Sequence, residues 1–84
     1  MPARTLHRSV TFARPFVLEG VEGSIPPGTY SVDTDEETID SLSFVAWRRV
    51  ATFIHLPVRG AIEKHQIDPL DLEASIAHDA APSP

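Results

Sequence analysis

The most hydrophobic stretch of the chain, residues 43–56 (SFVAWRRVATFIHL), has the alternation and the β-branched and aromatic residues of a β-strand. With a two-residue period, one face carries Phe44, Ala46, Val50, Ile54 and Leu56. The other face carries Val45, Trp47, Ala51 and Phe53. A strand that is apolar on both faces has to be covered on both, by another layer of its own fold or by a second molecule. Pro57 is expected to end this strand.

Two stretches upstream predict further strands. Residues 10–18 place Val10, Phe12, Phe16 and Leu18 on one side. Because Pro15 lacks a backbone donor, this stretch is an edge strand or is interrupted there. Pro27 and Gly28 match the central positions of a type II turn, which starts a strand over residues 29–35. Residues 35–43 remain open between a helical turn, capped by Thr34 or Asp35, and an extended segment with a turn at 40–41.

The last third of the chain predicts a short strand and a helix. Arg59 and Gly60 form a turn into a strand over Ala61–Ile67. Asp68 at the N-cap and Pro69 at the first helical position then begin a helix to about residue 78. Its apolar side is expected to consist of Leu70, Ala74 and Ala77, widened by Leu72 and Ile76, while Asp71, Ser75 and His78 face water.

Together these elements predict an α+β fold: a mostly antiparallel, curved or barrel-like sheet of about four strands with one C-terminal helix. A single domain of residues 1–84 is expected, with an ordered core over about 9–78 and flexible ends at 1–8 and 80–84. The helix can cover one face of the central strand, so the other face requires a second layer or a partner chain.

Composition narrows the class of protein. An 84-residue chain has a small core, and the absence of cysteine excludes disulfides. Neither a secretory signal nor a membrane span is apparent, so a cytoplasmic protein is expected. The net charge of −5 opposes nucleic-acid binding by the whole surface. Basic residues 1–14 and 48–64 alternate with acidic residues 19–40 and 68–79, which favours pairing between neighbouring antiparallel strands.

The residue types that carry catalysis or bind cofactors form no recognisable motif. The four histidines lack metal-ligand spacing, and the acids of residues 33–40 lack the glycine and terminal glutamate of a calcium loop. No nucleophile elbow and no glycine-rich phosphate loop is present. We therefore expect no metal, no cofactor and no enzymatic activity.

The candidate interaction surface consists of Trp47, Arg48, Arg49, Phe53 and His55. Strand alternation puts Arg48 opposite to Trp47 and Arg49 unless a bulge intervenes, and puts His55 on the side of Trp47. In one interpretation Trp47 is in the core and the arginines pair with the acids of residues 33–40. In the other, aromatic and arginine side chains together form a protein interface or stack on nucleic-acid bases.

Residues 26–30 (PPGTY), residues 35–37 (DEE) and the run from 43–44 (SF) to 48–52 (RRVAT) resemble a family of small uncharacterised bacterial proteins, over about residues 12–76. The resemblance implies an intact stand-alone domain and assigns no site. We predict a non-catalytic protein-binding or assembly module that is homodimeric. The alternative is a nucleic-acid-associated regulatory protein whose basic face is formed by Arg4, Arg8, Arg14, Arg48 and Arg49.

Overall fold

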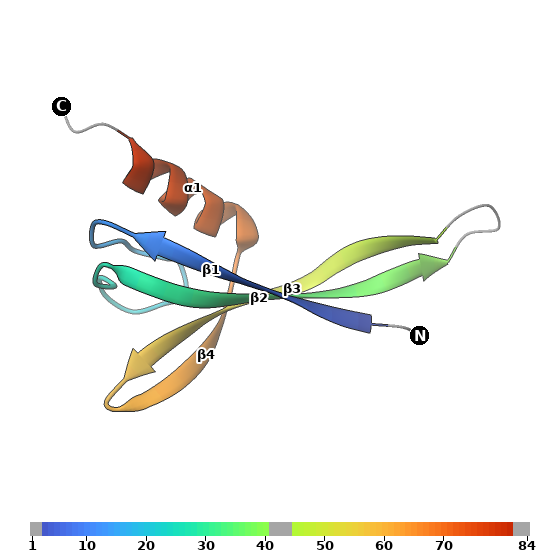
Figure 1. The fold of residues 1–84 in the computed structure, drawn as a ribbon, viewed down its shortest axis with the longest axis horizontal. Coiled ribbons are helices and arrows are strands. Elements are labelled where there is room, and N and C mark those ends of the chain that lie inside the picture. The colour runs from blue at the N-terminus through green and yellow to red at the C-terminus, as the bar shows by residue number, and fades with distance from the viewer. Residues whose placement is uncertain (1–2, 41–44, 82–84) are drawn as a thin grey trace.

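A computed structural model describes residues 3–40 and 45–81, which form one antiparallel sheet and one helix (Figure 1). The elements are β1 (Ala3–Phe12), β2 (Gly28–Asp40), β3 (Val45–Val58), β4 (Ala61–Ile67) and α1 (Pro69–Ala80). The strands lie in the order β1-β2-β3-β4, so the sheet has two edges and is not closed into a barrel. The α+β prediction of four antiparallel strands and one C-terminal helix is confirmed. Among the described residues, no helix is long and apolar enough to cross a membrane.

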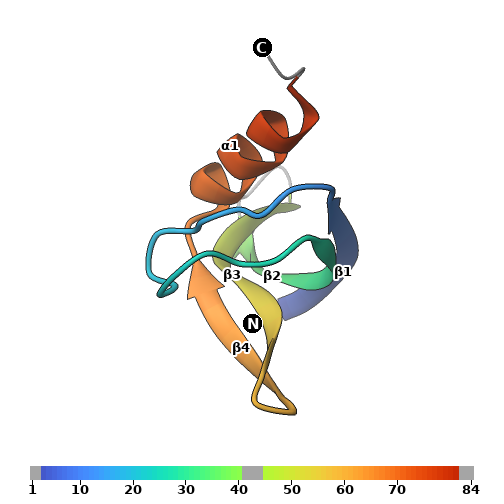
Figure 2. The ribbon, with the colours of Figure 1, turned by 90° about the vertical axis from the view of Figure 1, so that its left-hand side faces the viewer.

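The core lies on one face of one half of the sheet, which we call the core-side face. Strand residues on this face pair across the sheet, for example Val10 with Tyr30 and Val32 with Ile54. The second layer consists of α1 and the loop of residues 13–27, which surround the same end of the sheet (Figure 2). The buried apolar residues are Val10, Phe12, Phe16, Leu18, Ile25, Tyr30, Val32, Ile54, Leu56, Ile67 and Leu72. The opposite, open face of the sheet carries mainly polar residues.

The loop of residues 13–27 contributes to the core because it folds back on itself. Phe16 and Ile25 exchange two backbone hydrogen bonds of 2.9 and 2.7 Å. This pairing brings the Phe16 ring onto Phe12, with stacked centroids 3.6 Å apart. The stretch of residues 10–18 is therefore interrupted, as considered for Pro15: β1 is an edge strand that ends at Phe12, and Pro15 lies in the loop.

Strand β1 begins at Ala3, well before the predicted start at Val10. Residues 3–8, which we expected to be flexible, pair with residues 32–37 of β2. Residues 35–40 of β2 are extended, which excludes the helical turn considered for them, while residues 41–44 lie outside the described part. Strand pairing prevails here because opposite charges meet across it, as between Arg4 and Glu36 at 2.8 Å.

Of the two features predicted from prolines, the strand end at Pro57 is wrong, and so is the type II turn at Pro27 and Gly28, although the strand after it begins within one residue of the expected start. Pro57 does not end β3 but pairs with Ile62 inside the β3–β4 hairpin. Beyond Ile54, β3 no longer pairs with β2, so one side of this segment makes no ladder hydrogen bonds and tolerates a proline. Gly28 has φ +154°, not the +80° of a type II turn, and begins β2 directly. The predicted turn at Arg59–Gly60 is present, with positive φ at both residues.

Helix α1 begins as predicted, with the Asp68 carboxylate accepting a 2.8 Å hydrogen bond from the Leu70 amide. Its predicted buried side is confirmed for Leu72 and Ile76 but wrong for the other three residues. Leu72 is 1% exposed and Ile76 packs against the core, whereas Leu70 is 76% exposed. Ala74 and Ala77 are exposed too.

The orientation of α1 follows from polar contacts with the loop of residues 13–27. The Asp71 carboxylate accepts from the Glu19 amide at 2.8 Å, and the Ser75 hydroxyl donates to the Val17 carbonyl at 3.1 Å. At the other end, the Arg14 guanidinium donates to the carbonyls of His78, Asp79 and Ala81. Asp71 and Ser75, which we predicted to face water, thus bind the loop. The side of α1 that lies between these two residues and Ile76 faces the core.

Candidate functional site

A β-bulge in β3 divides the five residues of the candidate interaction surface between the two faces of the sheet. Thr34 pairs with Thr52, but Glu36 pairs with Arg49, so Val50 is an extra residue on β3. Trp47 and Arg49 consequently share the core-side face with Ile54. Arg48, Phe53 and His55 lie on the open face. The expectation that His55 shares a face with Trp47 is wrong, because the bulge reverses the alternation between them.

Beyond the bulge the sheet continues as a three-stranded ribbon that we call the arm, consisting of residues 3–6, 34–40 and 45–51. The arm projects away from α1 and β4 in an elongated molecule of 50 × 34 × 19 Å (Figure 1). Pairing of β3 with β4 begins only at Thr52, so residues 45–51 form a free strand edge. The arm contains no described buried apolar side chain, yet it holds four of the seven exposed large hydrophobic residues: Leu6, Ile39, Trp47 and Val50.

Trp47 lies on the surface of the arm. Its side chain is 38% exposed, and the Arg4 guanidinium sits 4.0 Å above its ring. Thr38, its cross-strand neighbour on β2, is buried. The interpretation of Trp47 as a core residue is therefore wrong, and the ring has apolar surface left for a partner.

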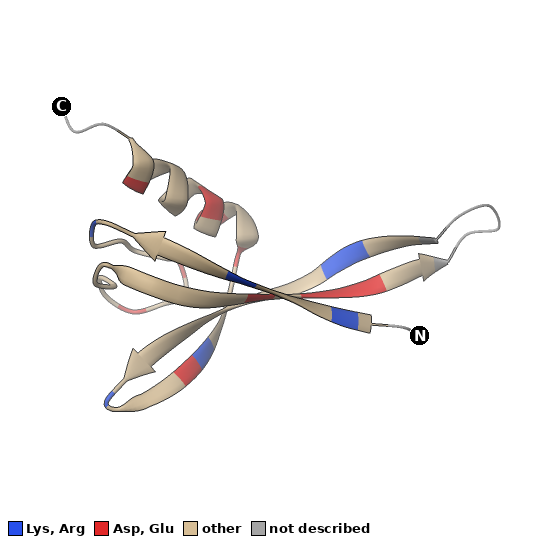
Figure 3. Ribbon diagram, in the orientation of Figure 1, with Lys and Arg blue, Asp and Glu red and all other residues tan. Residues whose placement is uncertain are grey.

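Pairing of the arginines with the acids of β2 is confirmed for Arg48 only. The Arg48 Nε donates to Glu37 at 2.9 Å, and Arg4 on the opposite strand pairs with Glu36. Figure 3 shows the acidic segment of β2 between basic segments of β1 and β3. Within the described part of the chain, Arg49 forms no ion pair and no hydrogen bond. Exposed pairs of this kind contribute about 0–1 kcal/mol each, so they favour the register more than they add stability.

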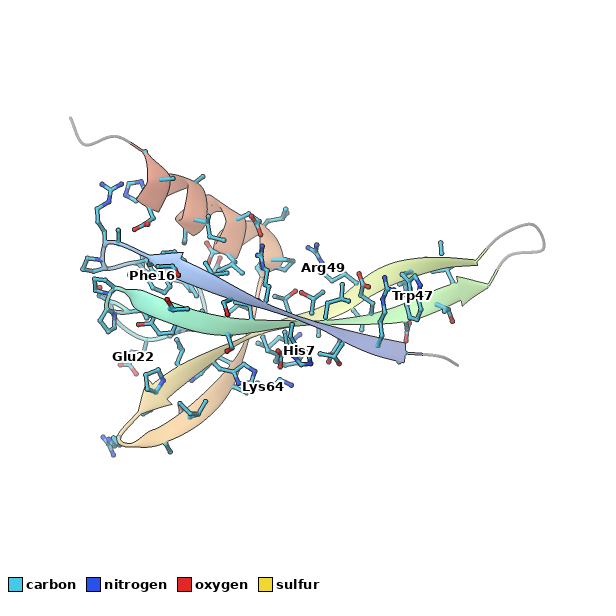
Figure 4. The ribbon with its side chains drawn as sticks, in the orientation of Figure 1. His7, Phe16, Glu22, Trp47, Arg49 and Lys64 are labelled. Carbon is cyan, nitrogen blue, oxygen red and sulfur yellow. The ribbon has the colours of Figure 1, made fainter. Side chains whose placement is uncertain are left out.

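A second polar group of residues lies on the open face, around the buried carboxylate of Asp33. His7 Nδ1 lies 2.6 Å from Asp33 Oδ1, and His55 Nε2 lies 2.8 Å from Asp33 Oδ2. Lys64 Nζ approaches the same carboxylate at 3.7 Å. Figure 4 shows His7 and Lys64 on the side of the sheet opposite to Arg49. Side chains from all four strands thus meet at one carboxylate.

The chemistry of this cluster follows from the carboxylate, which only accepts hydrogen bonds when ionised. Each imidazole must therefore donate an N–H to Asp33, which leaves His7 Nε2 and His55 Nδ1 directed outward. The hydrogen bonds from His55 and then His7 hold the pKa of Asp33 below its ordinary value of 3.8. Ser9 and Ser31 line the adjoining hollow, but among the described residues neither forms a hydrogen bond with an imidazole. No described group of three histidines or acids is arranged to hold a metal ion.

His7 and Asp33 were missed as partners of His55 in the sequence. The three residues come from three strands. They meet because the register places His7 and Phe53 opposite Asp33 on its two neighbouring strands. The only signal was the opposite charge of residues 1–14 and 19–40, which predicts that these segments are neighbours but does not give the register.

The Asp33 cluster predicts an acid-dependent stability. A carboxyl whose pKa is lowered by folding stabilises the protein above its unfolded-state value of 3.8, and this contribution is lost as the pH falls through the lower folded value. At pH 7 we expect Asp33→Asn to lower the free energy of unfolding by roughly 1–3 kcal/mol, the cost of weakened hydrogen bonds to a charged group. Below pH 4 the difference from the unmodified protein should shrink.

Urea unfolding between pH 2 and pH 7 measures this effect. Glu22→Gln is the matched control, because Glu22 is exposed and has no hydrogen bond or ion pair to a described residue. A stability difference between Asp33→Asn and the unmodified protein that stays constant down to pH 2 would contradict the role given to this carboxylate.

The roles of the arm residues and of the Asp33 cluster follow from their own geometry. A comparison of the chain with protein-family models, with curated proteins and with solved structures finds no match.

Proposed function

We propose that this chain is a non-catalytic assembly module that forms a homodimer through its arm. The observation that carries the proposal is a three-stranded ribbon with no described layer on either face, which exposes Leu6, Ile39, Trp47 and Val50. Leu6 and Trp47 lie on the core-side face of this ribbon and Ile39 on its open face. Exposed apolar residues rimmed by charged ones are typical of protein interfaces. Tryptophan and arginine, which meet here as Trp47 and Arg4, are the residue types enriched at interface hot spots.

The charges of the arm favour a second copy of this chain as the partner. The arm carries three basic residues, Arg4, Arg48 and Arg49, against four acidic ones, Asp35, Glu36, Glu37 and Asp40. The arm is thus close to neutral although the whole chain carries −5, so two arms can approach without strong repulsion. A small domain with half of its sheet uncovered also has the most to gain from burying apolar surface against a copy of itself.

The dimer is tested by Trp47→Ala. Because truncation of a central interface tryptophan costs about 2 kcal/mol or more, we expect the dimer dissociation constant to rise roughly thirtyfold or more. Sedimentation equilibrium measures this constant. Since Trp47 is the sole tryptophan, its fluorescence in the unmodified protein should also shift to shorter wavelength as the concentration rises.

Ile62→Ala is the control, because Ile62 is exposed on β4, outside the arm. It should leave dimerisation unchanged. A protein that sediments as a monomer at several hundred micromolar, or a Trp47→Ala variant that dimerises as tightly as the control, would refute the arm as a self-association surface.

Nucleic-acid binding is not proposed, since nothing in the structure favours it. Four of the five arginines of the basic face are engaged elsewhere: Arg4 with Glu36, Arg8 with Glu73, Arg14 with the end of α1, and Arg48 with Glu37. They also lie on different sides of the molecule, as Arg48 and Arg49 do on β3.

A further inference from the structure

A hollow of about 450 Å³ lies at the root of the arm, between the first turn of α1 and the core-side face of the sheet. Its apolar surface is provided by Leu6, Pro69 and Leu72. Charged and polar groups surround this surface. They belong to Arg8, Thr34, Glu36, Arg49, Thr52 and Glu73, while His7, whose imidazole lies on the open face, also borders the hollow. The combination of an apolar floor with a few converging polar groups is typical of small-molecule sites, and the volume lies within their usual range.

Thr52 provides the first independent sign of a ligand. Its side chain is 3% exposed, and its Oγ1 is the one described buried side-chain polar atom without a hydrogen-bond partner. Thr34, directly opposite on β2, lines the same hollow but makes no hydrogen bond with it. Buried hydroxyls in native proteins are nearly always paired, so this atom lacks a partner that a bound molecule can supply.

Arg49 provides the second sign. Figure 4 shows its side chain on the helix side of the sheet, and within the described part of the chain it has no ion pair. The two carboxylates that line the hollow with it are already engaged, since Glu36 binds Arg4 and Glu73 binds Arg8. Among the described residues that line the hollow, Arg49 is therefore the charged side chain without an ion pair, and its guanidinium is planar.

We propose that this hollow binds a small amphipathic monocarboxylate. The carboxylate pairs with the Arg49 guanidinium, whose fork of donors matches two oxygens. The hydrocarbon part lies on Leu6, Pro69 and Leu72, and a hydroxyl along the chain supplies the missing partner of Thr52 Oγ1. A phosphate monoester is disfavoured, because Glu36 and Glu73 line the same hollow and repel a second negative charge.

The hollow shares Leu6 and Arg49 with the arm, but Trp47 does not line it, so ligand binding and dimerisation can still fail separately. Binding is therefore measured both in the unmodified protein and in Trp47→Ala, in which Arg49 and Thr52 are intact. The probes are octanoate, 3-hydroxyoctanoate, 1-octanol and octyl phosphate, titrated while amide chemical shifts are followed by NMR.

We expect saturable shifts around residues 49–52 and 69–73 with octanoate, and binding at least tenfold weaker for 1-octanol and octyl phosphate. Arg49→Gln should weaken octanoate binding at least tenfold. Arg59→Gln, which alters an arginine in the β3–β4 turn without an ion pair to a described residue, should not. Thr52→Val should remove the advantage of 3-hydroxyoctanoate over octanoate while leaving the fold intact, because the hydroxyl it deletes has no partner.

Three results would overturn the proposal. One is the absence of saturable shifts at millimolar octanoate, and another is equal binding of 1-octanol and octanoate. The third is equal loss of affinity in Arg49→Gln and Arg59→Gln, which would show an effect of net charge and not of this site.

Discussion

Ile54→Ala is expected to lower the free energy of unfolding by about 3–4 kcal/mol, whereas Val50→Ala on the same strand should lower it by less than about 1 kcal/mol. Ile54 is fully buried between the sheet, the loop of residues 13–27 and α1, so its truncation leaves a cavity in the centre of the core. Val50 is the extra residue of the bulge and is 47% exposed, so its truncation leaves no cavity. Urea unfolding at pH 7 measures both values.

This comparison tests the bulge because the two residues are four positions apart on one strand. In an unbroken strand they would lie on the same face, so Val50 would share the core-side face with Ile54. Ile54→Val, which removes a single methylene, should cost about 0.5–1.5 kcal/mol and serves to show that the site responds to volume. Comparable losses for Val50→Ala and Ile54→Ala would mean that β3 has no bulge.

The bulge shows where the sequence stops predicting this fold. Residues 43–56 identified the strand that the structure describes from Val45 onward, since alternation and β-branched residues are local properties. The two faces predicted for it are wrong before the bulge, where Trp47 shares a face with Ile54. A bulge depends instead on the partner strand: it exists because Glu36 pairs with Arg49 while Asp35 pairs with Ala51. The run Arg48, Arg49, Val50 and Ala51 is compatible with either register, so nothing within β3 indicates which one is adopted.

The second layer of the core was misjudged for a similar reason. Val10, Phe12, Phe16 and Leu18 have the spacing of one continuous strand, and all four are indeed buried. However, the chain leaves the sheet after Phe12, and the loop that follows folds back so that Phe16 and Leu18 pack on the core-side face. Periodicity predicted which side chains are apolar and buried, but it does not distinguish a strand from a loop that folds back over that strand.

The candidate site was predictable only as a set of residue types. Trp47 and the arginines beside it were candidate site residues because they interrupt an apolar run. Trp47 is exposed on the arm, as an interface residue would be. The Asp33 cluster was not predictable, since His7, Asp33 and His55 are far apart in sequence and follow no motif spacing. Clusters that form across a sheet require the register, which is a property of the whole fold.

The two halves of the molecule are stabilised by different interactions. One half has a core closed by α1 and by the loop, and the other half, the arm, is held by strand hydrogen bonds and exposed ion pairs. Regions with few buried apolar contacts open at low free energy, so the arm should exchange its amide hydrogens faster than the core half. Assembly through the arm would stabilise the part of the chain that has no core of its own.

The end of the sheet that faces α1 gives the second large expected effect. Leu72→Ala should lower the free energy of unfolding by about 3 kcal/mol, because Leu72 is the residue of α1 that is buried in the core, at 1% exposure. Leu70→Ala should change it by less than about 0.5 kcal/mol, since that side chain is 76% exposed.

Both leucines lie in the first turns of one helix and undergo the same chemical change, so helix propensity cancels between the two variants and only burial differs. Urea unfolding followed by far-ultraviolet circular dichroism measures the loss and reports whether α1 remains helical in Leu72→Ala. The polar contacts of Asp71, Ser75 and Arg14 should keep α1 docked at low temperature even in that variant. Equal losses for the two variants, or a larger loss for Leu70→Ala, would mean that α1 packs with the side formed by Leu70, Ala74 and Ala77.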